Sequence, residues 1–150
     1  MQILDCTFRD GGYYTNWNFT NKLLDEYLKT VAKLPISIVE LGYLSHNKDF
    51  NGPFYHLNNN FLKTCKKKLN KKQKIYAMIN AKEIKNANQL IQLLKETHKN
   101  IDGVRFAISP YDVEKFLPFI KKASKKFQKI SFNVNLMYLS KWYKDLNFAK

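Results

Sequence analysis

The fold is decided near the N-terminus by the stretch Ile3-Leu4-Asp5-Cys6-Thr7-Phe8-Arg9-Asp10-Gly11-Gly12-Tyr13-Tyr14. Its first part is rich in apolar residues and predicts a strand over residues 3–8. An arginine, an acid and two glycines follow, and glycine permits a positive φ or a close approach of another group to the backbone. Two interpretations are open: a charged site at the end of a strand, or a surface turn in which Asp10-Gly11 reverses the chain.

Four further runs of apolar, β-branched or aromatic residues predict strands over residues 36–41, 75–79, 104–108 and 130–136. Helical patterns lie between these strands, over residues 20–34, 61–69 and 87–97 and from Ser109 onward. Thr20 or Asn21 is the expected N-cap of the first helix, and Pro118 should kink or divide the last. The alternation of strands and helices predicts βα units and a parallel sheet.

Two α/β architectures fit such units. The length of 150 residues suits a single domain and an open five-stranded sheet. A complete (β/α)8 barrel takes about 250 residues, and its functional side chains gather at the strand ends. Alternation predicts polar residues on one face of the first and fifth strands: Asp5, Thr7 and Arg9, and Ser131, Asn133 and Asn135. These polar faces favour a TIM-barrel-type parallel sheet, truncated after about five βα units and forming one partial domain over residues 1–150.

The net charge of +14 comes mostly from lysine, which supplies 24 of the 26 basic residues. Base readout favours arginine, so we expect no specific nucleic-acid partner. No apolar run is long enough to span a membrane, and Cys6 and Cys65 form no CxxC pair, so we expect a cytoplasmic protein. The two arginines, Arg9 and Arg105, are notable against this lysine bias because a guanidinium can hold a carboxylate with two hydrogen bonds.

The opening motif, with Trp17 and Phe19 after it, resembles the start of the metallolyase barrels related to hydroxymethylglutaryl-CoA lyase and 4-hydroxy-2-oxovalerate aldolase. That superfamily is named for an Asp-Arg-Glu signature, which Arg9, Asp10 and Glu40 match. Two further segments, Gly52-Pro53-Phe54 and Asn135-Leu136-Met137, are similar to the aldolase branch. The resemblance runs over essentially the whole chain.

The resemblance implies a metal-dependent aldolase or lyase that acts on a 2-oxo acid through a pyruvate-type enolate. Asp10 would be a ligand of Mg2+ or Mn2+, and Arg9 would offset the charge of the enolate. Glu40 would fix Arg9 or polar groups near it; alternatively, it would form a buried ion pair with Arg9 or Arg105 without chemistry, and the two roles are compatible. Tyr13 takes the place of the histidine base of the oxovalerate aldolases.

Two further residues, Asn135 and His46, are expected to contact substrate. His46 and His56 belong to a long irregular segment, residues 42–60, over the presumed active face, whereas His98 is expected to be solvated.

The sequence departs from the family pattern because it has no His-x-His pair of late metal ligands. This departure supports an alternative: a catalytically inactive, truncated barrel that serves as an interaction module or is a remnant. Five strands of a barrel would also leave two edges unpaired, which predicts self-association or a complementary chain.

Overall fold

The computed structural model describes residues 2–136. The elements in chain order are β1 (Leu4–Asp5), α1 (Thr7–Thr15), α2 (Asn21–Val31), β2 (Ile38–Tyr43), α3 (Asn59–Lys68), β3 (Lys74–Asn80), the 3-10 helix η1 (Ala81–Glu83), α4 (Ala87–Lys95), β4 (Gly103–Ile108), the 3-10 helix η2 (Pro110–Asp112), α5 (Val113–Lys126) and β5 (Ser131–Leu136).

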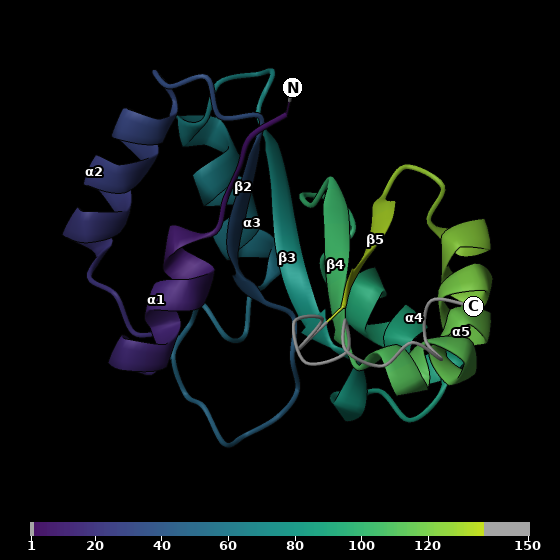
Figure 1. The fold of residues 1–150 in the computed structure, drawn as a ribbon. Helices are drawn as coiled ribbons and strands as arrows, with labels where there is room; N and C mark the ends of the chain where they lie inside the picture. Colours follow the sequence, from purple (N-terminus) through teal and green to yellow (C-terminus); the bar gives the residue numbers. More distant parts are fainter. Residues whose placement is uncertain (1, 137–150) are drawn as a thin grey trace, which may run out of the picture.

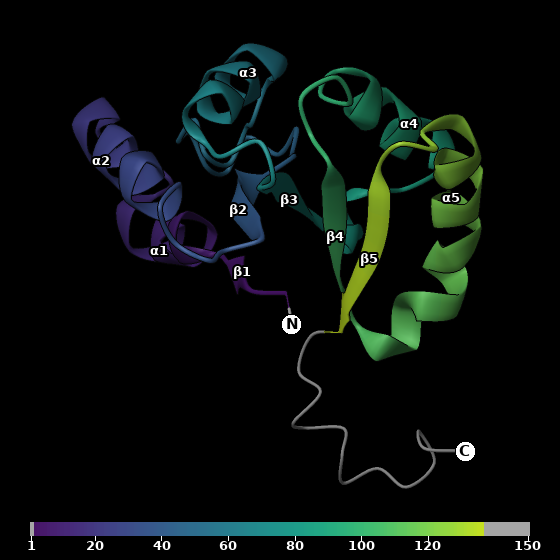
Figure 2. The same ribbon diagram turned by 90° about the horizontal axis from the view of Figure 1, so that it is seen from above.

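The five strands form one parallel sheet in the order β1-β2-β3-β4-β5, so each strand pairs with the next along the chain. The sheet curls, and the helices cover its outer side while its inner side stays open (Figures 1 and 2). Seen from above, strands and helices form two concentric arcs (Figure 2). The prediction of a TIM-barrel-type sheet of about five βα units is therefore confirmed.

The outer faces of the strands pack against the helices and form the apolar core. Val39, Ile75 and Phe106 are fully buried there, together with Leu28 of α2 and Leu90 of α4. The inner face carries polar groups in register across the sheet. Glu40 pairs with Tyr76, Tyr76 with Gly103, and Arg105 with Asn133. Within residues 2–136, no helix has the length and apolar character needed to cross a bilayer.

The first βα unit differs from the prediction. Only Leu4–Asp5 pairs with β2, and a helix begins at Thr7 where a strand was expected to continue to Phe8. The carboxylate of Asp5 accepts hydrogen bonds from the backbone N–H and the hydroxyl of Thr7, at 3.0 and 3.2 Å, and so turns the chain into α1. The predicted alternation of Asp5, Thr7 and Arg9 on one strand face is therefore wrong.

The two glycines lie inside α1 and do not form a surface turn. No glycine among the described residues has a positive φ. The expected close approach holds at Gly12, where an added Cβ would lie 2.1 Å from Cδ1 of Trp17. The fully buried Trp17 ring packs directly on this glycine and donates from Nε1 to the backbone oxygen of Arg9 at 3.0 Å.

The Gly12→Ala variant is therefore expected to be destabilised by about 1–3 kcal/mol, the usual cost of overpacking a core. Gly11→Ala is the matched control, because its Cβ would meet Phe19 at an ordinary 3.7 Å. There, alanine should stabilise the helix by a few tenths of a kcal/mol up to about 1 kcal/mol. Chemical denaturation followed by tryptophan fluorescence measures both. Equal effects of the two substitutions would contradict the packing described for Gly12.

The remaining helices follow the sequence closely. Thr20 caps α2 by accepting from the backbone N–H of Leu23 at 3.2 Å, and Asn58 and Asn86 cap α3 and α4 in the same way. Of the kink or division predicted at Pro118, the division is not observed, since α5 continues through this residue as one helix.

Buried weak acids make the fold less stable at alkaline pH. Burial raises the pKa of the Cys65 thiol from 9.0 to about 12. Burial, followed by a hydrogen bond to Asp5, also raises the pKa of Tyr27. The folded chain therefore holds these protons more tightly than the unfolded chain, which loses them first as the pH rises.

We expect the free energy of unfolding to be retained below pH 9 and to fall between pH 9 and about 12. Urea titrations at pH 8 and pH 10.5 measure this loss. The Cys65→Ala variant, which lacks the thiol, should lose less stability over the same interval. An identical pH dependence of the variant and the wild type would contradict the assignment to Cys65.

Candidate active site

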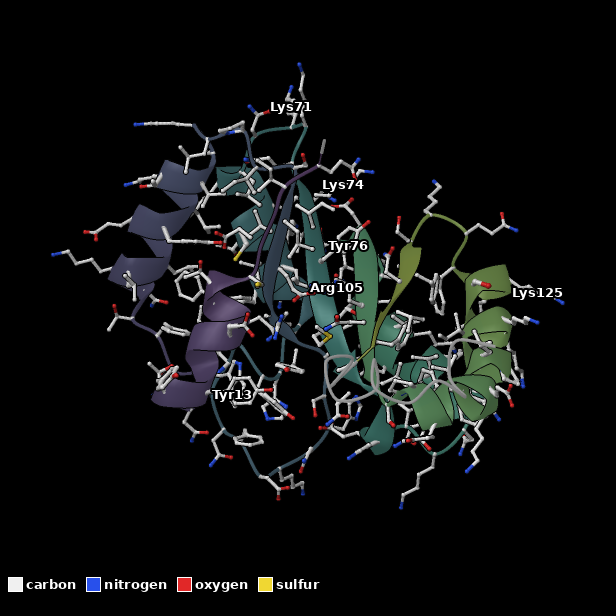
Figure 3. All side chains as sticks on the ribbon, in the orientation of Figure 1. Tyr13, Lys71, Lys74, Tyr76, Arg105 and Lys125 are labelled. Atoms are coloured by element: carbon white, nitrogen blue, oxygen red, sulfur yellow. The ribbon has the colours of Figure 1, made fainter. Side chains whose placement is uncertain are left out.

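The centre of the candidate site is the carboxylate of Glu40, which is fully buried between two arginines on the inner face of the sheet. Nε of Arg9 donates to Oε1 of Glu40 at 2.8 Å. Nη1 of Arg105 contacts Oε1 and Oε2 of Glu40 at 3.2 and 3.3 Å. Arg105 lies near the middle of the sheet (Figure 3). Helix α1 and strands β2 and β4 thus each contribute one member of this arginine–glutamate cluster.

The two guanidinium groups outnumber the carboxylate between them, so Arg9, Glu40 and Arg105 together carry a net positive charge. Burial by itself disfavours the charged form of Arg9, but the hydrogen bond and charge of Glu40 and the charge of Asp10 outweigh it and raise the pKa of Arg9. The side chains of Arg9 and Arg105 retain 13% and 21% exposure, whereas Glu40 has none. Asp10 also pairs with Arg9, so the two arginines and the two carboxylates balance in charge, while both guanidiniums keep partial exposure on the inner face of the sheet.

Asp10 lies at the edge of this cluster, with its side chain 54% exposed. One carboxylate oxygen accepts a hydrogen bond from Nη1 of Arg9, and the other accepts from the Cys6 thiol at 3.1 Å. Burial first, and then the hydrogen bond and charge of Asp10, raise the pKa of Cys6 to about 11, so the thiol remains protonated at neutral pH. Among residues 2–136, no group of three His, Cys, Asp or Glu side chains is placed to hold a metal ion. Asp10 could supply one oxygen ligand, but these residues alone do not form a complete metal site.

Tyr13 faces a second part of the site, an aromatic cavity at the carboxyl ends of β2, β3 and β4. Its hydroxyl lies 2.9 Å from the hydroxyl of Tyr43, and its ring meets the edge of Trp17. The aromatic cavity has a volume of about 240 Å³ and is lined by Tyr13, Trp17, Tyr43, Phe50, Tyr55, Asn80, Lys82, Ala107 and Ser109. Burial, and then the hydrogen bond with Tyr13, raise the pKa of Tyr43, which therefore stays protonated at neutral pH.

The long segment between β2 and α3 places its two histidines apart from this site. His46 contacts Glu96 at 3.3 Å and lines a separate cavity beside α4. The ring nitrogens of His56 contact the backbone oxygens of Ser45 and Phe50, so this side chain holds the segment together. The segment is packed against η1, since the hydroxyl groups of Ser45 and Tyr55 both donate to the carboxylate of Glu83.

The structure thus brings together Arg9, Asp10, Glu40 and Tyr13, all on α1 and β2, and leaves His46 elsewhere. Asn135 lies on β5, in register with Ala107 of β4. His98 is exposed, as expected, beyond the end of α4. The catalytic and binding roles of these residues remain predictions.

The sequence predicted an ion pair of Glu40 with Arg9 or Arg105, and the structure shows both contacts. The sequence analysis missed three polar residues of the aromatic cavity: Tyr43, Asn80 and Ser109. Each of these three stands at the last position of a strand or directly after it. In a parallel barrel this position marks functional side chains, and that signal could have found them.

No protein-family model matches this chain, and no curated protein matches it. Among solved structures, the chain is similar to one described as the N-terminal domain of a putative aldolase from Bacteroides vulgatus. The two share 36% sequence identity and a TM-score of 0.85 over 99% of this chain. The chain spans 48% of the length of that structure. The open half-barrel of five βα units is therefore an aldolase-like fold.

Proposed function

We propose that this chain forms the N-terminal part of the catalytic barrel of a divalent-metal-dependent aldolase or lyase that acts on a 2-oxo acid. Within the aldolase-like fold, we place it in the superfamily related to hydroxymethylglutaryl-CoA lyase and 4-hydroxy-2-oxovalerate aldolase. The observation that carries the proposal is the cluster of Arg9, Glu40 and Arg105 on the inner face of the sheet. The similarity to a structure described as an aldolase domain supports the reaction class.

In this proposal Arg9 stabilises the negative charge that develops on the enolate oxygen when the carbon–carbon bond breaks or forms. A preorganised cation acts most strongly where charge develops and where reorganisation is small. Glu40 contacts only the Nε edge of Arg9, while Nη1 of the same guanidinium reaches Asp10. The ion pair therefore fixes the orientation of the guanidinium and directs its Nη1 toward Asp10.

Asp10 is the proposed ligand of Mg2+ or Mn2+, for which a carboxylate oxygen is a suitable donor. When bound, the metal would act as a Lewis acid toward the carboxylate and keto oxygens of the 2-oxo acid. The other ligands would come from water, from substrate and from residues beyond those described.

Tyr13 is the proposed proton donor or acceptor, since its hydroxyl is accessible from the aromatic cavity. The protonated hydroxyl of Tyr43, 2.9 Å away, can donate to it and hold its ring in place. Asn135 would contact the substrate from β5. His46 would contact it only if the segment that carries His46 moved toward the aromatic cavity.

The test is the Asp10→Ala variant in a retro-aldol assay, with 4-hydroxy-2-oxopentanoate as substrate, added Mn2+, and pyruvate detected by reduction to lactate. We expect a loss of more than about a hundredfold in kcat/KM, because even residues that only support metal ligands cost 10- to 100-fold. Asp25→Ala is the control, since this carboxylate lies on α2 and pairs with Lys68. Unchanged turnover and unchanged Mn2+ affinity in Asp10→Ala would contradict the proposal.

The edges of the described sheet favour a second role, as an interaction module. Within the described residues, β1 and β5 each pair with a single strand and leave an open edge. We propose that a second copy or a complementary chain covers these edges. Light scattering should show a mass above the 17.8 kDa of one chain, either for the chain by itself or after the complementary chain is added. A stable association without metal binding or turnover would favour the module over the enzyme.

A further inference from the structure

The aromatic cavity borders a larger one, because Lys82 and Ser109 line both. The larger cavity has a volume of about 480 Å³ and lies between η1 and the start of α5. Lys82 belongs to η1, and Ser109 follows the last residue of β4. The two cavities thus share a border at the carboxyl ends of β3 and β4, beside the proposed reaction centre at Tyr13.

The larger cavity is positively charged. Lys82, Lys85 and Lys115 line it, and Asp112 is the acid in its lining. None of these three lysines takes part in an ion pair within the part of the chain that the structure describes. Three cations and one anion leave an excess of positive charge, which favours an anionic ligand.

The same cavity has an apolar wall formed by Ile84, Ile108, Phe116 and Phe119. Ile84, Ile108 and Phe116 are buried, and Phe119 packs against the core. A fully hydrated inorganic ion gains nothing from such a wall, whereas an organic anion can bury apolar atoms against it. The lining therefore suits a molecule that combines an apolar segment with an anionic end.

A second basic cavity in the chain provides a comparison. It is lined by Lys99, Lys125, Lys126 and Lys129, and it lies at the far end of α5, beside Phe127. It shares no residue with the aromatic cavity. Phe127 and Ile130 also give that cavity an apolar lining, so neither lysine content nor apolar lining distinguishes the cavity beside Tyr13; its border with the candidate active site does.

We infer that this larger cavity binds the anionic end of the proposed enzyme's substrate. The substrate class is then a carbonyl compound with an apolar segment that ends in a carboxylate or a phosphate. The anionic end lies among Lys82, Lys85 and Lys115, and the reacting carbonyl lies beside Tyr13. This inference rests on the proposed function for its reaction and on the two adjoining cavities for its ligand.

Calorimetry with the full chain tests the binding without any turnover. The probes are 4-phenylbutanoate, its neutral amide and 3-phenylpropyl phosphate. We expect both anions to bind at least about tenfold more tightly than the amide, since a charge-assisted hydrogen bond contributes about 1.5 kcal/mol or more. The tighter of the two anions identifies the carboxylate or the phosphate as the preferred group.

Lys115→Gln should weaken binding of the preferred anion about tenfold, whereas Lys125→Gln, which removes the same charge at the distant basic cavity, should not. Equal affinities of acid and amide, or equal losses in the two variants, would overturn the inference. Selective anion binding in a protein without retro-aldol activity would support the cavity and contradict the proposed function. Retro-aldol activity without anion selectivity would support the proposed function and contradict the anion-binding role of the cavity.

Discussion

The Glu40→Gln variant is expected to lose about 3–5 kcal/mol of unfolding free energy, the usual cost of removing one partner from a buried ion pair. The substitution preserves the size of the side chain but removes the negative charge between Arg9 and Arg105. The two guanidiniums would then face one another with little solvent to separate them, since their side chains are only 13% and 21% exposed. Urea denaturation followed by tryptophan fluorescence measures the loss.

The matched control is Asp25→Asn, which removes the same charge from a pair formed with Lys68 on the helical side of the molecule. Solvent screens that exposed pair, so its removal should leave the unfolding transition nearly unchanged. Equal stabilities of Glu40→Gln and Asp25→Asn would show that the arginine–glutamate cluster is not a buried, mutually dependent unit.

The Arg9→Lys variant is expected to lose about 10²–10³ in kcat, the cost of removing one preorganised group that stabilises developing charge. Lysine keeps the positive charge but has a single ammonium group. Its ammonium cannot hold Glu40 and Asp10 in the fixed planar arrangement that the guanidinium of Arg9 provides. The measurement is the metal-dependent retro-aldol assay at saturating substrate, with pyruvate formation as the readout.

Arg105→Lys is the matched control, because Arg105 contacts Glu40 alone among the charged residues of the cluster. Both variants preserve the net charge, so a purely electrostatic role of the cluster would reduce kcat equally in each. We expect Arg9→Lys to be the more severe by at least about tenfold, since positioning is lost only there. Equal or reversed effects would contradict the role assigned to Arg9.

The half-barrel could be predicted from the sequence because β2, β3, β4 and β5 show compact apolar or alternating patterns. The helices were predictable for a similar reason, since Thr20 and the apolar spacing of α2 specify its start and its buried face. The first strand was predicted to be too long because Leu4, Cys6 and Phe8 alternate with polar residues as in a strand. Asp5 overrides that pattern locally by capping the turn at Thr7, and the packing of Gly12 against Trp17 favours the helix.

The charged centre was predictable in part, because Arg9 and Glu40 match a known signature and arginine is rare in this chain. The contact of Arg105 with the same carboxylate depends on the register of three strands, which local patterns do not specify. The same holds for Tyr43 and Asn80, which meet in the aromatic cavity only after the sheet has curled. His46 was expected near the substrate because it belongs to the segment 42–60. Its actual partner, Glu96, is distant in the sequence and could not be predicted from local patterns.

The exchange of the methyl protons of pyruvate for deuterium, followed by NMR in D2O with Mn2+ removed before acquisition, tests the central claim most directly. This reaction requires only the enolate, so it needs neither an aldehyde nor the anion cavity. We predict that the wild-type chain accelerates the exchange over buffer containing Mn2+ and that both Arg9→Lys and Asp10→Ala reduce this acceleration at least about a hundredfold. Exchange at the buffer rate with the wild type, or equal exchange in all three proteins, would contradict an enolate-stabilising site at Arg9 and Asp10.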